Sequence, residues 1–167
     1  MNILVQIRRY KPGEERALFE VYYSAIHLTA SRDYDAEQIQ AWAPKDLDMN
    51  LWEKRIRGIN PFVAELNGEL VGYADLQANG YIDHFFVSGT HARRGIGSLL
   101  MKHLLGEAKA LGLSELSSDV SRTAQPFYEK FGFVVIEQRR PERRGVIIPN
   151  ALMKRWRHES AEAKADA

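Results

Sequence analysis

A glycine-containing turn with two arginines lies between a predicted strand and a predicted helix. It consists of Arg93, Arg94, Gly95, Ile96, Gly97 and Ser98. The aromatic and β-branched run 81–87 ahead of it is typical of a strand, and apolar residues recur at helical spacing over 99–111 behind it. The first turn of a helix offers unpaired backbone N–H groups and the positive end of the helix dipole. The sequence therefore predicts an anion-binding turn, with phosphate as the expected ligand.

Two other kinds of phosphate loop do not fit this turn. A Walker loop has a lysine immediately before its serine or threonine, whereas Ser98 follows Gly97. A dinucleotide-binding fingerprint has a third glycine where this chain has Leu100, and it normally opens the domain. Neither NTP hydrolysis nor dinucleotide binding is expected.

A second motif, Ala-Gln-Pro-Phe-Tyr-Glu-Lys-Phe-Gly-Phe at 124–133, lies downstream. Together with the turn, which matches both glycines of Gln/Arg-x-x-Gly-x-Gly/Ala, it resembles the GNAT superfamily of acetyl-CoA-dependent N-acetyltransferases, within it a bacterial subgroup of mostly unassigned substrate. The resemblance extends to about Trp156. Two positions depart from the pattern. Ala92 stands where the family has Gln or Arg, so that one of the following arginines would supply the contact, and Ser121 stands where many members have Asn.

The resemblance implies that acetyl-CoA (coenzyme A) binds along the strand 81–87 and the turn. The residues expected to bind it are Phe85, Phe86, Val87, Arg93, Arg94, Gly95, Ile96, Gly97, Ser98, Ser121 and Ala124. The tyrosine of the family's Ala-x-x-x-Tyr motif, here Tyr128, is expected to be the general acid that protonates the departing thiolate. The alternative is a core tyrosine that anchors its helix.

Asp83 and His84 are the candidates for the proton acceptor, and Asp83 is the predicted catalytic residue of the two. Strand alternation sends them to opposite faces unless a bulge intervenes, so only one is expected to face the pocket. Asp83 is predicted to share a face with Phe85. Ordered water is the remaining alternative for the base.

In the GNAT fold that the resemblance implies, the segment 27–52 is expected to cover the acceptor side. The predicted substrate-side residues are His27, Tyr34, Trp42 and His84. Five acidic residues within 31–50 favour a cationic small amine, unless they cap helices or face solvent. The basic run 139–144 predicts a solvated hairpin loop that can border the acceptor entrance, which favours an anionic acceptor instead. The sequence leaves both alternatives open.

Composition limits the function classes. The chain has 167 residues, with 23 basic and 22 acidic, so its overall charge gives no reason to expect nucleic acid or anionic membrane as a partner. The absence of cysteine excludes disulfides and thiolate sites, and no histidine spacing is typical of a metal site, so no metal is predicted. No signal-peptide pattern and no apolar run near the roughly 20 residues of a membrane span occur, so a cytoplasmic protein is expected.

The elements follow one another in a mixed α/β order. Strands are predicted at 4–9, 62–66, 70–76, 81–87, 114–120, 133–138 and 146–156, with helices between them. The resemblance implies a GNAT-like mixed, mainly antiparallel sheet of about seven strands flanked by helices. One domain is predicted over 1–157, followed by a disordered tail at 158–167.

The predicted function is transfer of an acetyl group from acetyl-CoA to a primary amine of a small molecule or peptide, by direct attack in a ternary complex. The alternative is a non-catalytic acyl-CoA-binding regulatory domain that uses the same cleft. Tyr128 separates the two, because a sensor has no need for an acid beside the sulfur. A monomer or homodimer is expected.

Overall fold

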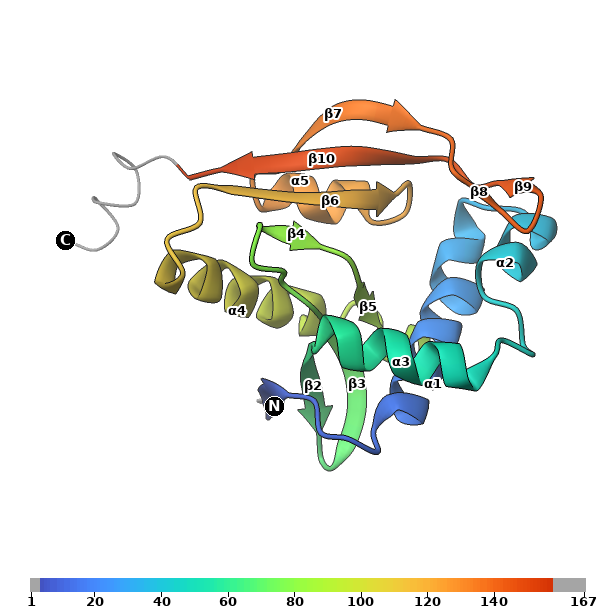
Figure 1. Ribbon diagram of the computed structural model, residues 1–167, viewed down its shortest axis with the longest axis horizontal. Coiled ribbons are helices and arrows are strands. Elements are labelled where there is room, and N and C mark those ends of the chain that lie inside the picture. The colour runs from blue at the N-terminus through green and yellow to red at the C-terminus, as the bar shows by residue number, and fades with distance from the viewer. Residues whose placement is uncertain (1–3, 158–167) are drawn as a thin grey trace.

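Two four-stranded sheets lie side by side in the computed structural model, which describes residues 4–157 (Figure 1). The first sheet contains β1 (Val5–Arg9), β2 (Phe62–Leu66), β3 (Glu69–Ala74) and β5 (Phe85–Val87), in that order. The second has the order β4-β6-β10-β7, formed by β4 (Tyr81–Ile82), β6 (Glu115–Ser121), β10 (Asn150–Trp156) and β7 (Val134–Arg139). All pairings within them are antiparallel except that of β4 with β6.

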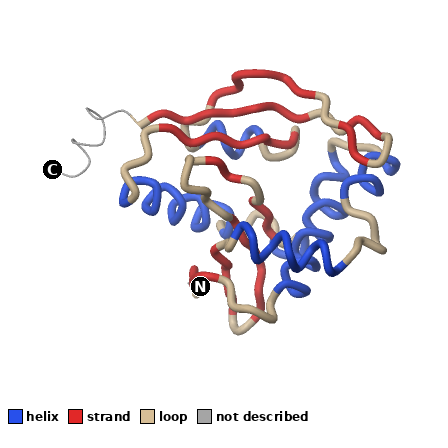
Figure 2. Tube along the Cα trace, in the orientation of Figure 1, coloured by secondary structure: helices blue, strands red, loops and turns tan. Residues whose placement is uncertain are grey.

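The strand predicted at 81–87 is divided between the two sheets. Its first part, β4, pairs in parallel with β6, and its second part, β5, pairs antiparallel with β3. Figure 2 shows the two parts as separate strand segments joined by a short loop. The chain thus leaves one sheet and enters the other between Ile82 and Phe85.

Helices cover the sheets. They are α1 (Glu15–Ser24), α2 (Ala36–Trp42), α3 (Met49–Ile59), α4 (Ile96–Ala110) and α5 (Gln125–Lys130). A π-helical turn over Ala25–Thr29 and a 3₁₀ turn over Ala30–Arg32 continue α1. Asp35 caps α2 in a capping box with Gln38, and the Asp48 side chain accepts the N–H of Asn50 at the start of α3.

Two hydrophobic cores flank the broken strand. One joins α1, α2 and α3 to the first sheet and contains Leu18 and Ile56, both fully buried. The other lies under α4 and α5, where Leu100 and Leu104 recur at helical spacing and are fully buried. Both cores contain residues of β2 and β3, so α1 and α4 pack against the first sheet from opposite faces.

The predicted mixed, mainly antiparallel architecture flanked by helices is confirmed. The strand count is larger than predicted, because 81–87 is divided and because the predicted strand 146–156 becomes β9 (Val146–Ile147) and β10, with β9 paired to β8 (Glu142–Arg143) in a separate hairpin. No helix within residues 4–157 is long and apolar enough to cross a membrane. The predicted tail, 158–167, lies outside the described residues.

Gly89 allows the segment before α4 to pack closely on α1 and the turn after it. A Cβ at this position would lie 2.4 Å from the Ser24 carbonyl oxygen and 2.7 Å from Leu28 Cβ. We expect Gly89→Ala to lower the free energy of unfolding by about 1–3 kcal/mol in urea denaturation. Gly106→Ala is the matched control, because Gly106 lies within α4 in open space, and this change is expected to stabilise by up to about 1 kcal/mol. Equal effects of the two substitutions would contradict the packing role of Gly89.

Candidate functional site

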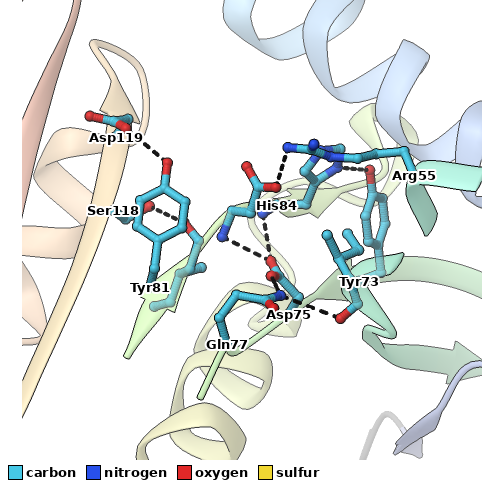
Figure 3. Close-up of polar contacts among 11 residues, drawn as sticks. Arg55, Tyr73, Asp75, Gln77, Tyr81, His84, Ser118 and Asp119 are labelled. Atoms are coloured by element: carbon cyan, nitrogen blue, oxygen red, sulfur yellow. Dashed lines mark hydrogen bonds and ion pairs between the residues drawn. The ribbon is translucent and has the colours of Figure 1, made fainter. Parts of the chain in front are cut away.

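The buried carboxylate of Asp75 bonds the two residues at the break between β4 and β5 (Figure 3). One of its oxygens accepts the backbone N–H groups of Asp83 at 2.9 Å and His84 at 2.6 Å. The other oxygen accepts the Gln77 side-chain amide. Two successive N–H groups directed at one oxygen are incompatible with the alternation of a regular strand, so the backbone departs from it here. Burial raises the pKa of Asp75 to about 6, although the hydrogen bonds oppose that rise.

Both Asp83 and His84 consequently line the same cavity, together with Phe86. The prediction that only one of the two faces the pocket is wrong, and so is the prediction that Asp83 shares a face with Phe85. The Phe85 ring instead packs against Tyr128 in the core under α4 and α5, with 5.8 Å between ring centroids. The physical reason is the irregular backbone that Asp75 stabilises.

The cavity has a volume of about 410 Å³, within the size range of small-molecule sites. It lies between α1, α2, α3, the break, β6 and the β8–β9 hairpin. Its lining comprises Tyr22, Tyr34, Trp42, Leu47, Leu51, Trp52, Arg55, Asp83, His84, Phe86, Asp119, Ser121, Pro141, Arg143, Arg144, Ile148 and Asn150. Three of the four predicted substrate-side residues are therefore brought together, and Ser121, predicted on the cofactor side, joins them.

Tyr34 and Trp42 form an aromatic wall of the cavity, with 5.5 Å between their ring centroids. The Tyr34 hydroxyl is already used, because it donates to the Pro149 carbonyl and accepts the Arg122 N–H. Tyr34 thus presents an apolar surface rather than a free hydroxyl.

His27 is not part of this cavity, contrary to the sequence-based prediction. Its Nε2–H donates to the Ala43 carbonyl at 2.7 Å, and its ring stacks on Tyr23 with centroids 3.9 Å apart. These contacts link the π-helical turn after α1 to the end of α2. His27 therefore has a structural role in the observed arrangement.

The predicted acidic lining is also absent from this cavity. The acids in question are Asp33, Asp35, Glu37, Asp46 and Asp48, and all five are exposed. Three of them serve the fold, because Asp35 and Asp48 cap helices and Asp33 accepts the Thr123 hydroxyl. The charged residues that line the cavity come from elsewhere in the chain.

Each of the two carboxylates that line the cavity has a cationic partner. Asp83 forms an ion pair with Arg55 of α3. Asp119 of β6 accepts the Tyr81 hydroxyl at 2.8 Å and an N–H of Arg139 at 2.8 Å.

His84 lies deep in the site, where its Nδ1 is 3.0 Å from the Tyr73 hydroxyl (Figure 3). Burial lowers the pKa of His84 to about 4, opposed by the charge of Asp83 and reinforced by the charges of Arg55 and Arg143. The imidazole is accordingly neutral at pH 7.

A fork opens where β5 turns away from β6 (Figure 1). The backbone groups of His84 and Ser88 bond to β3, so alternation along the ladder directs those of Phe85 and Val87 to the opposite side. On that side β6 pairs only with the shorter β4 among the described strands. The main-chain groups of Phe85 and Val87 are thus directed to the side on which an extended ligand with amide groups could pair with them.

The turn predicted to bind an anion follows β5 and the short 3₁₀ turn after it. Gly95 is the N-cap of α4 at φ +82°, a conformation that favours glycine, and Arg93 is also left-handed at φ +63°. Gly97 lies beside Phe127, where a Cβ would make an ordinary contact at 3.4 Å from Cζ. Arg93 and Arg94 are exposed, and so is Ala92. The exposed loop leads into the 15-residue helix α4, whose N-terminus favours an anion.

Tyr128 is buried and belongs to the core under α4 and α5 rather than to the cavity lining. Its hydroxyl lies near the Ser118 side chain, which lowers the pKa of Tyr128 against the larger effect of burial, and the Ser118 hydroxyl donates to the Ile82 carbonyl at 2.8 Å. The Tyr128 hydroxyl therefore lies where β4 ends and the fork begins. Burial raises the pKa of Tyr128 well above its usual range, so it is protonated at neutral pH. Nearby, Ala124 precedes α5 and donates its N–H to the Ser121 carbonyl.

Several site residues were not predicted from the sequence. Asp75 interrupts an otherwise apolar strand run, which is a signal of a buried functional carboxylate. Arg55 lies on the exposed face of an ordinary amphipathic helix, where the sequence has no signal that separates it from its neighbours. Tyr73 and Asp119 belong to strands in which alternation predicts the buried side chains but not their hydrogen-bond partners.

Comparison with known proteins finds acetyltransferases by family model, by sequence and by structure. Residues 30–154 match the family model described as acetyltransferase (GNAT) domain. The chain is 37% identical over 150 residues, 90% of this chain and 95% of the relative, to the uncharacterized N-acetyltransferase YafP of Escherichia coli K12. A GCN5-related N-acetyltransferase from Rhodopseudomonas palustris has a similar structure, with a TM-score of 0.88 and 27% identity over 94% of this chain and 99% of that one. The PaiA N-acetyltransferase of Thermoplasma acidophilum, solved with coenzyme A, shares the fold at a TM-score of 0.70 and 18% identity, over 93% of this chain and 100% of that one.

Asp75→Ala is expected to lower the free energy of unfolding at pH 7 by about 2–4 kcal/mol, because two buried N–H groups lose their acceptor. Asp75→Asn keeps one acceptor oxygen and is expected to cost less. Urea denaturation measures both, with the exposed Asp46→Ala as control, for which we expect a change within about 0.5 kcal/mol. Equal losses for the alanine and asparagine variants would show that the break does not depend on this oxygen.

The imidazole of His84 is expected to stay neutral from pH 8 down to pH 5. In the unfolded chain its pKa is near 6.5, so as pH falls below that value the unfolded chain binds the proton first. The stability that neutral His84 contributes is therefore complete above pH 6.5 and is lost as pH falls toward about 4. NMR titration of the histidine ring protons, with His84→Gln to assign the resonance, measures this directly. A midpoint for His84 above pH 6 would contradict the described burial.

Proposed function

We propose that this chain, which belongs to the GNAT acetyltransferase family, transfers the acetyl group of acetyl-CoA to a primary amine. The amine belongs to a small molecule held in the cavity. The observation that supports this function is the meeting of two sites at one break. The fork between β5 and β6 begins at the residues that also line the cavity, Asp83 and His84. A group bound in the fork and a molecule bound in the cavity would thus approach each other there.

Two features are proposed to bind the cofactor: the main-chain groups of β5 that do not pair with β3, and the turn before α4. Main-chain groups of Phe85 and Val87 would bond the extended amide arm of coenzyme A, and the N-terminus of α4 with Arg93 and Arg94 would bind its phosphates. When bound, acetyl-CoA would supply the acetyl thioester. A Cβ at Gly97 would lie 3.7 Å from Val87 Cγ2, so the helix terminus lies beside the end of β5.

The acceptor amine must lose a proton to attack. Arg55 engages one carboxylate oxygen of Asp83, so the other oxygen is the proposed proton acceptor, directly or through water. The positive charges of Arg143 and Arg144, which have no carboxylate partner among residues 4–157, disfavour an ammonium ion in the cavity. That environment lowers the pKa of the bound amine, and a weak base is then sufficient.

Tyr128 is the proposed proton donor to the departing thiolate. Its hydroxyl lies beside Ser118 at the start of the fork, and its raised pKa keeps the proton in place at neutral pH. In the proposed step the amine nitrogen bonds the acetyl carbon, the carbon–sulfur bond breaks, and the sulfur receives the tyrosine proton. The proton lost by the amine goes to Asp83, and solvent restores both groups.

The test is thiol release from acetyl-CoA with a panel of polyamines, aminoglycosides, amino acids and peptides. We expect release with at least one small-molecule amine. Tight coenzyme A binding without release for any acceptor would support the regulatory-domain alternative instead.

Tyr128→Phe is expected to lower kcat by roughly 10²-fold or more, because it removes the proton donor while keeping the ring in the core. Coenzyme A affinity is expected to stay within about twofold. The matched control is Tyr10→Phe, since Tyr10 is buried in the other core and lies outside the cavity. Unchanged turnover and an unchanged pH profile in Tyr128→Phe would contradict the acid role.

A further inference from the structure

One arginine of the cavity lining has neither an ion pair nor a side-chain hydrogen bond within residues 4–157. Of the three arginines in its lining, Arg55 is paired with Asp83, and Arg144 donates to the Ala41 carbonyl at 2.7 Å. The Arg143 side chain, by contrast, has neither an ion pair nor a side-chain hydrogen bond with any residue in 4–157. It extends from β8, the short strand of the hairpin that borders the cavity. The site is thus left with excess positive charge at Arg143 and Arg144.

The charge of Arg143 acts on the inner part of the cavity. Burial is the main cause of the lowered pKa of His84 and of the raised pKa of Tyr22, and the charge of Arg143 reinforces the first shift and opposes the second. Arg143 therefore faces the same space as the residues at the break, although it lies on the far hairpin. A small molecule that fills the cavity would contact both.

We infer that the acceptor bears a carboxylate in addition to its amine, and that Arg143 binds this carboxylate. The inference rests on the proposed function and specifies its substrate class, an amino acid or a similar amino carboxylate. The guanidinium group is planar and bonds a carboxylate through two parallel N–H groups. When the amine of such a molecule lies near Asp83, its carboxylate would neutralise the positive charge of Arg143 on the hairpin.

The rest of the lining fits this substrate class. Tyr34, Trp42 and Phe86 supply apolar surface for the remainder of the molecule. A polyamine would instead place its second cation near Arg143 and Arg144, while the two aspartates that could attract it are already paired. The acidic residues of 31–50, which favoured a cationic acceptor in the sequence, are outside the cavity.

The experiment compares amino acids with two counterparts each, the carboxamide and the decarboxylated amine. L-Phenylalanine, phenylalaninamide and 2-phenylethylamine form one such series, and equivalent series for aliphatic and polar side chains complete the panel. kcat/KM is measured by thiol release. Affinity for the protein–coenzyme A complex is measured by calorimetry, which does not depend on turnover.

The variants are Arg143→Gln, Arg143→Lys and Arg140→Gln. Arg140 is the matched control, because it belongs to the same basic run and is exposed but does not line the cavity. We expect the best carboxylate to exceed its amide and amine counterparts by roughly tenfold or more in affinity. Arg143→Gln is expected to abolish that preference, Arg143→Lys to retain part of it, and Arg140→Gln to leave it unchanged.

The outcomes separate the inference from the proposed function. Carboxylate preference in calorimetry without thiol release would support the inference and overturn the acetyl transfer. Release with amines that shows no carboxylate preference would support acetyl transfer and overturn the inference. Equal effects of Arg143→Gln and Arg140→Gln, or no binding by any amino carboxylate, would likewise overturn it.

Discussion

The buried carboxylate of Asp75 is the constraint on which this structure depends. It satisfies two successive backbone N–H groups at a point where no strand partner could satisfy both. A buried carboxylate is unfavourable without such donors, and its raised pKa reflects that cost. With the donors in place, one continuous sequence run can serve two sheets. The fork, the cavity and the positions of the residues between them follow from this one interaction.

The two cores position different residues around that break. The core under α4 and α5 fixes the turn at Gly95 and places Tyr128 at the start of the fork. The core of α1, α2 and α3 builds the aromatic wall and places Arg55 against Asp83. The two cores also meet along the first sheet, because alternate residues of β2 and β3 belong to one core or the other. The parts proposed to bind the cofactor and the acceptor therefore share these strands as a common support.

The charges of the cavity come from regions far apart in the chain. Arg55 comes from α3, Asp83 from the break, Asp119 from β6 and Arg143 from the β8–β9 hairpin. The acidic segment 31–50, which is closest in sequence to the aromatic wall, contributes none of them. Its aspartates at 35 and 48 are used as helix caps, because a short side chain at a helix start is within reach of the unpaired N–H groups.

The sequence by itself determined most of the element order, the family resemblance and the glycine turn at 93–98, because each depends on neighbours a few residues apart, whereas it left open whether the acidic residues of 31–50 cap helices. It also brought out Tyr34, Trp42, Asp83 and His84 as candidates, all of which line one cavity. Tertiary structure alone decided that Asp83 and His84 face the same way and that His27 lies elsewhere. It also left Arg143 as the uncompensated charge. These outcomes depend on long-range contacts, in which a buried carboxylate overrides strand alternation and a distant hairpin supplies the cavity's charge, and local patterns carry no information about either.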